Sequence, residues 1–65
     1  MIKTVLRFQN NMVAVFDGKG EQIPGYQGRY QEVRDNVLKD APEDAVFGHF
    51  PDYAPNFQEV SREEW

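Results

Sequence analysis

Side chains that could carry catalysis are scarce in this chain of 65 residues, which has no cysteine, one serine, one threonine and one histidine. Nucleophilic catalysis needs a hydroxyl, thiol or amine beside an activating base. Ser61 stands in a charged segment, and Thr4 stands in an alternating apolar stretch with no base near it in the sequence. A catalytic pair of Ser61 and His49 is therefore disfavoured, and we expect a protein that is not an enzyme.

The spacing of His49 and Asp52, H-x-x-D, could supply two ligands to a metal ion, with Glu43 or Asp44 as a third. A structural zinc site takes four Cys or His ligands, and a catalytic one takes three protein ligands and a water. The pattern falls short of both. The favoured interpretation is a strand histidine packed beside Phe47, and we expect neither a metal nor a cofactor.

Two pairs of neighbouring carboxylates, Glu43–Asp44 and Glu63–Glu64, could do acid–base chemistry only if burial raised one pKa of a pair. Adjacent charges of this kind are more simply solvated. Residues 18–20, Gly-Lys-Gly, are typical of a turn, because the full glycine pattern of a phosphate-binding loop is missing.

Aromatic side chains concentrate in residues 47–57, where four aromatics, a histidine and two prolines fall within eleven positions. Aromatic rings bury a large area at low entropic cost and prolines stiffen a loop, so interfaces favour both. The same rings could also fold back over the chain's own sheet, and the two roles can coexist. The candidate binding residues are Phe47, His49, Phe50, Asp52, Tyr53 and Phe57.

The elements that must position these residues begin with two alternating stretches, 2–9 and 12–17, which predict a β-hairpin around Asn10-Asn11. A two-residue turn would place Gln9 opposite Met12 and leave apolar residues on both faces of the pair. One predicted face carries Leu6, Phe8, Val13 and Val15, and the other carries Val5, Met12, Ala14 and Phe16. Because one helix covers only one face, the rest of the chain or a second molecule must cover the other.

A helix is predicted from residue 28 to Asp40, since Tyr30, Val33 and Val37 continue an i, i+4, i+7, i+11 stripe that begins at Tyr26. Residues 21–23 are a candidate for a short third strand, and residues 45–50 predict a further strand. A right-handed crossover through the helix would place that strand beside the first one, in the order 2-1-3.

The predicted fold class is therefore α+β, a small single domain over residues 1–65. It has an antiparallel β-hairpin, a candidate short third strand, one α-helix and a further strand, β-β-(β)-α-β. Residues 51–65 form an acidic, aromatic C-terminal extension that should pack on the sheet or its edge. The spacing of Ser61 and Glu64 matches a capping box and predicts one closing turn.

The chain has a net charge of −4, and its sequence shows no basic stripe. Both features argue against direct binding to nucleic acid. No run approaches the roughly 20 apolar residues that cross a bilayer, and the amino-terminal residues do not resemble a secretory signal. We expect a cytoplasmic protein that does not bind membranes.

The leading functional hypothesis is a non-catalytic interaction or regulatory module whose partner is another protein or a second copy in a homodimer. One alternative is a small-ligand-binding domain, with a pocket between the helix and the C-terminal segment lined by Tyr30, His49, Tyr53 and Trp65. Another is an acidic mimic of nucleic acid that inhibits a DNA-binding enzyme. The mimic would require Asp52, Glu59, Glu63 and Glu64 to align on one exposed face.

Overall fold

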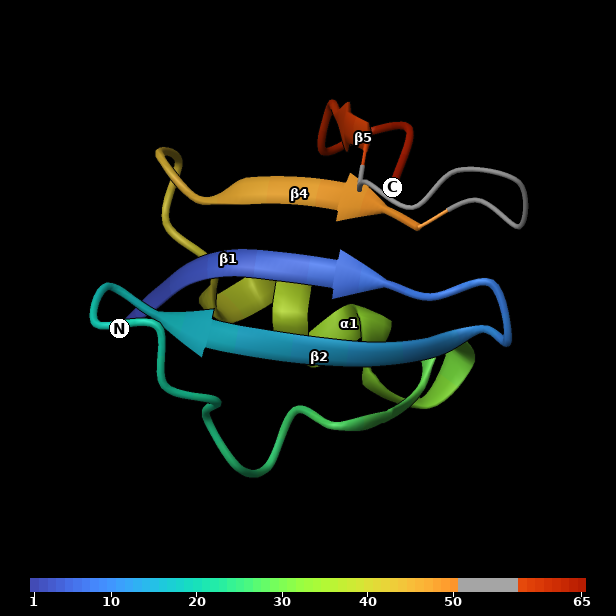
Figure 1. Cartoon of the computed structure of the whole chain (residues 1–65), viewed down its shortest axis with the longest axis horizontal. Helices are drawn as coiled ribbons and strands as arrows, with labels where there is room; N and C mark the ends of the chain where they lie inside the picture. The colour runs from blue at the N-terminus through green and yellow to red at the C-terminus, as the bar shows by residue number, and fades with distance from the viewer. Residues whose placement is uncertain (51–57) are drawn as a thin grey trace.

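A computed structural model describes residues 1–50 and 58–65. Within these ranges the elements are β1 (Ile2–Arg7), β2 (Met12–Asp17), β3 (Gly28–Arg29), α1 (Tyr30–Asp40), β4 (Val46–His49) and β5 (Gln58–Val60). The strands form one mixed sheet in the order β3-β2-β1-β4-β5, and α1 lies against one of its faces (Figure 1). The predicted α+β class is confirmed.

The hairpin of β1 and β2 has a different register from the predicted one. Val5 lies opposite Val15, and the amide N–H of Phe8 donates to the carbonyl oxygen of Met12 at 2.8 Å. The loop therefore has three residues instead of two. Its last residue, Asn11, has a φ of 67°, a left-handed conformation that asparagine tolerates and that three-residue hairpin loops use. The predicted two-residue turn was wrong.

A one-residue change of register moves every side chain of β1 to the opposite face relative to β2. Val5 therefore joins Val13 and Val15 on the helix side of the sheet. Between Ile2 and Thr4 the register shifts by one residue, a β-bulge, and this brings Ile2 back to the helix side, where it is buried. The predicted division of the hairpin residues between two faces was wrong, although apolar residues do occupy both faces.

The parallel pairing of β4 with β1, in which Val5 lies beside Phe47, confirms the crossover connection through the helix. Helix α1 starts later than predicted, because Gly28 and Arg29 pair with β2 as the short strand β3. It ends at Asp40, as predicted. The candidate strand at 21–23 contributes an isolated bridge between Gln22 and Phe16 instead of a strand.

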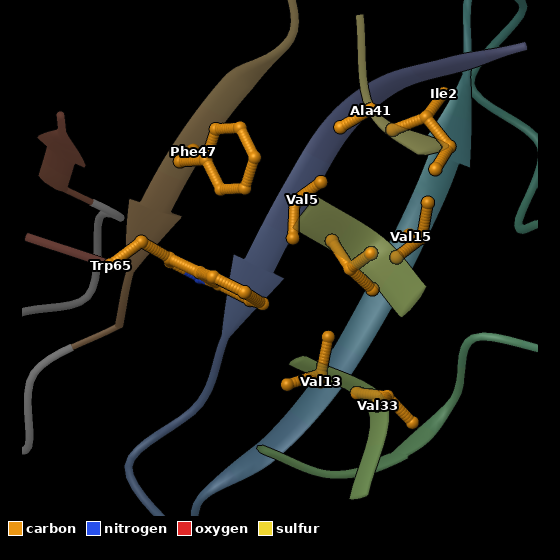
Figure 2. Close-up of a cluster of buried hydrophobic side chains, with 9 residues drawn as sticks. Ile2, Val5, Val13, Val15, Val33, Ala41, Phe47 and Trp65 are labelled. Atoms are coloured by element: carbon orange, nitrogen blue, oxygen red, sulfur yellow. The ribbon is translucent and has the colours of Figure 1, made fainter. Parts of the chain in front are cut away.

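The core lies between the sheet and α1, and Trp65 completes it (Figure 2). Its indole is 2% exposed and makes edge-on contacts with the rings of Tyr30 and Phe47, at centroid distances of 5.0 and 5.1 Å. The other members of the buried cluster are Ile2, Val5, Val13, Val15, Val33, Val37 and Ala41. Trp65 thus joins the end of the described chain to both layers of the fold.

The closing turn that carries Trp65 is held from two sides. The hydroxyl of Ser61 donates to a carboxylate oxygen of Glu64 at 2.9 Å, so the predicted closing turn is confirmed. The guanidinium of Arg62 donates to the carbonyl oxygens of Ala41 and Pro42, at 3.2 and 2.6 Å. Carbonyl groups at the end of a helix lack partners within it, so Arg62 fastens the turn to the end of α1.

A candidate interaction face of the sheet

The sheet face opposite α1 carries a continuous set of uncharged side chains, which we call the open face. Strand alternation and pairing place them together, since Leu6 lies between Ala14 on β2 and Gly48 on β4. The open face consists of Thr4, Leu6, Phe8, Met12, Ala14, Phe16, Val46 and Phe50. Figure 1 views the sheet from this side, with α1 behind β1 and β2 and no described helix or strand in front.

The two sheet faces differ in burial. On the helix side Val5 and Val15 have no exposed area, whereas on the open face Leu6 and Phe16 are half-buried, Met12 is 38% exposed and only the small Ala14 is buried, at 8% exposed. Half-burial is what strand neighbours alone provide when no second layer covers a sheet. Among the described residues the open face is therefore less buried than the helix side.

Two stacked phenyl rings close one end of the open face. The rings of Phe8 and Phe50 lie 5.2 Å apart between centroids, with an angle of 2° between their planes. The amide N–H of Phe50 donates to the carbonyl oxygen of Arg7 at 3.0 Å, which extends the β1–β4 pairing to this level. The stack therefore lies at the carboxyl ends of β1 and β4.

A cavity of about 430 Å³ lies beyond the carboxyl ends of the parallel strands β1 and β4. It is lined by Arg7, Phe8, Gln9, Asn11, His49, Phe50 and Gln58. The Nε2 atom of His49 is buried and has no hydrogen-bond partner among the described residues. The side-chain amides of Gln9 and Gln58 at this place could orient a small polar ligand.

The Arg7 guanidinium at this cavity is held by the fold itself. Its Nε and Nη2 atoms donate to Oδ1 of Asn11 at 3.0 and 2.8 Å, and its Nη1 donates to the carbonyl oxygen of Trp65 at 2.9 Å. The guanidinium carbon lies 3.6 Å from the centre of the Tyr30 ring. Arg7 thus connects the hairpin loop, the closing turn and the helix. In the sequence, the one sign of this role is a charged residue within an apolar strand.

Shifted pKa values occur at two carboxyl groups in turns and at a phenol that is bonded to the end of α1. The backbone amides of Glu21 and Lys19 donate to Asp17 and lower the pKa of its carboxyl group. Bonds from Ser61 lower the pKa of Glu64. The hydroxyl of Tyr26 donates to Asp40 at 2.6 Å, which raises the pKa of the phenol. Each of these groups stabilises local structure.

Of the sequence-predicted binding residues, His49 and Phe50 both line the cavity at the strand ends, although they lie on opposite sides of β4. Phe47 is 2% exposed in the core, His49 lies on the same side of β4, and Phe50 lies on the open face. Asp52, Tyr53 and Phe57 lie outside the described residues. Sequence reasoning recognised that both faces are apolar but placed the residues of β1 on the wrong side, so it did not find the open face as a unit.

Within the described ranges, no three His, Cys, Asp or Glu side chains gather as they would around a metal ion. Helix α1 is too short and too polar to cross a membrane, and the same search of the described residues found no other candidate span. Of the residues expected to line a pocket between helix and C-terminal segment, Tyr30 and Trp65 are in ring contact, and His49 lines the cavity at the strand ends.

Comparison with protein-family models, with curated proteins and with solved structures found no match. The functional interpretation therefore depends on the geometry of this chain.

Proposed function

We propose that this protein is a small cytoplasmic, non-catalytic interaction module that binds another protein through the open face. The observation that carries the proposal is the contrast between the two sides of one sheet, with a packed core behind it and a half-buried apolar layer in front. Contiguous apolar patches on small proteins commonly mark interaction sites.

The composition of the open face supports a protein partner. Three phenylalanines and one methionine, Phe8, Met12, Phe16 and Phe50, lie on it, and aromatic residues and methionine are enriched where proteins bind each other. Such side chains provide contact area without a reacting group. The hydroxyl of Ser61 and the guanidinium of Arg7 are engaged in hydrogen bonds that hold the fold together. Their structural use agrees with a role in binding.

A second candidate is a small-ligand site in the cavity at the ends of β1 and β4. Its volume of about 430 Å³ is in the range of ligand pockets, and its lining includes His49, whose buried Nε2 has no hydrogen-bond partner among the described residues. Chemical-shift changes confined to residues such as Gln9 and His49 in a metabolite screen would favour this candidate over the protein partner.

The test of the leading proposal is the variant Met12→Lys, which places a charge on the most exposed part of the open face. Asn36→Lys adds the same charge to an exposed position on α1 and serves as the control. Affinity capture of partners and sedimentation should show every association weakened by Met12→Lys and unchanged by Asn36→Lys. Associations that both variants retain in full, or a strict monomer that captures nothing, would remove the support for the proposal.

A further inference from the structure

Two opposite charges border the open face at its two edges. Arg29 on β3 lies directly opposite Met12, and Glu59 on β5 lies directly opposite Gly48. Directly paired residues on neighbouring strands share a face, so both charged residues belong to the open side of the sheet. The apolar side chains of β2, β1 and β4 separate them.

Both charged residues are available to a partner. Arg29 and Glu59 are exposed, and neither takes part in an ion pair among the described residues. The surface is apolar in the middle, positive at the β3 edge and negative at the β5 edge. It is complementary to a second copy of itself when the β3 edge of one copy faces the β5 edge of the other.

We infer that the partner at the open face is a second copy of this chain, related by a two-fold axis parallel to the strands. This inference rests on the proposed function. Such an axis places β3 of one copy over β5 of the other, so Arg29 faces Glu59 twice. A two-fold axis perpendicular to the strands and parallel to the sheet would instead place β3 over β3 and bring like charges to the same edge. Charge complementarity therefore selects the first arrangement, an aligned sandwich of two sheets.

The strand levels allow this contact. Arg29 lies at the level of Met12 and Glu59 at the level of Leu6, since Leu6 is the β1 neighbour of Gly48. Two residues along a strand correspond to about 7 Å, and packed sheets lie about 10 Å apart. An extended arginine and an extended glutamate can together cover that separation.

The size of the face predicts a weak dimer. Strand spacing and rise give a face of about 20 by 20 Å, so two copies cover on the order of 800 Å² together. Stable complexes bury about 1,200 to 2,000 Å². The dimer should therefore form reversibly and become populated only at high protein concentration.

Charge reversal tests the arrangement. Sedimentation should show a dimer fraction that rises with concentration, and Arg29→Glu or Glu59→Arg alone should each weaken the dimer about tenfold, because each converts both contacts into repulsion. The double variant Arg29→Glu, Glu59→Arg should restore the wild-type affinity. Lys19→Glu and Glu43→Arg, which change exposed charges away from the open face, are the matched controls and should leave the dimer unchanged.

A wild-type monomer at every concentration would overturn the inference, as would a double variant no tighter than the single ones. Circular dichroism on each variant separates lost association from lost folding. If the chain stays monomeric but Met12→Lys abolishes binding of a different protein, the proposed function stands and the homodimer falls. If Met12→Lys leaves every association unchanged, the proposed function itself fails.

Discussion

At the scale of single residues, Trp65 is the largest residue type in the described core. Its ring contacts both Tyr30 of α1 and Phe47 of β4, so one residue joins the two layers. A chain of this length has a total stability of about 3 to 10 kcal/mol. The loss of a single large buried ring is therefore comparable with the whole stability of the protein.

We expect Trp65→Ala to lower the free energy of unfolding by about 3 to 5 kcal/mol, a large part of the total stability. Trp65→Phe keeps an aromatic ring in the cavity and should cost less. Urea denaturation followed by far-ultraviolet circular dichroism is the suitable measurement, because the chain has one tryptophan and its fluorescence disappears in both variants. Equal stability of the alanine variant and the wild type would show that the indole is not part of the core.

The turn after β2 gives a prediction about pH. Donation by the backbone amides of Glu21 and Lys19 lowers the pKa of Asp17 in the folded state. A lowered pKa contributes stability above the ordinary aspartate value of about 4, and this contribution is lost as the pH falls through the folded-state value. Asp17→Asn should therefore lose less stability than the wild type when the pH is lowered from 5 to 2.

The control for this prediction is Glu43→Gln, which removes an exposed carboxylate elsewhere. Chemical denaturation at a series of pH values should give the wild type and Glu43→Gln nearly the same acid sensitivity. An Asp17→Asn variant that is as acid-sensitive as the wild type would show that these amide hydrogen bonds do not act on the carboxyl group.

At the scale of elements, the entry into α1 depends on Gly28. Its φ of +145° suits glycine, and an added Cβ would lie 3.4 Å from a methyl group of Val33. Gly28→Ala should lower the free energy of unfolding by about 1 to 3 kcal/mol. Gly18→Ala, at a position with open space around it, should stay within about 0.5 kcal/mol of the wild type. Urea titration compares the two, and equal stabilities would contradict the strained entry.

Strands β1, β2 and β4 and helix α1 could be predicted from the sequence, but the short strand β3 and the alignment of the first two strands could not. Period-two alternation identified β1 and β2, and the stripe through Val33 and Val37 identified α1. The register depends on whether Gln9 belongs to the first strand or to the loop, and two adjacent asparagines suit both two-residue and three-residue turns. The bulge after Ile2 has no local signal either. The sequence therefore predicted that a second apolar face must be covered, but it did not predict which residues form that face.

The position of Trp65 also lay beyond sequence reasoning. The spacing of Ser61 and Glu64 predicted the closing turn, which the structure confirms. Nothing in that spacing indicates that the turn docks on α1, because the docking comes from Arg62 and carbonyl groups twenty or more positions earlier in the chain. Long-range contacts of this kind leave no periodic pattern.

At the scale of the whole molecule, the described sheet has one face packed against α1 and one open face. The stability of the protein should therefore depend on association. Anything that binds the folded chain and not the unfolded one stabilises it. We expect the midpoint of thermal unfolding to rise with protein concentration for the wild type. The rise should vanish in Met12→Lys and persist in Asn36→Lys. A midpoint independent of concentration in all three would argue against self-association.

The central place of β1 in the sheet affects how the chain can fold during synthesis. Its neighbour β2 follows within five residues, but its parallel neighbour β4 begins only at Val46. While the ribosome adds the residues between them, over seconds at roughly 5 to 20 residues per second, one edge of β1 has no native partner. A nascent hairpin with an unpaired edge can pair with another chain. The need for ribosome-associated chaperones to shield β1 should therefore be greatest before β4 emerges.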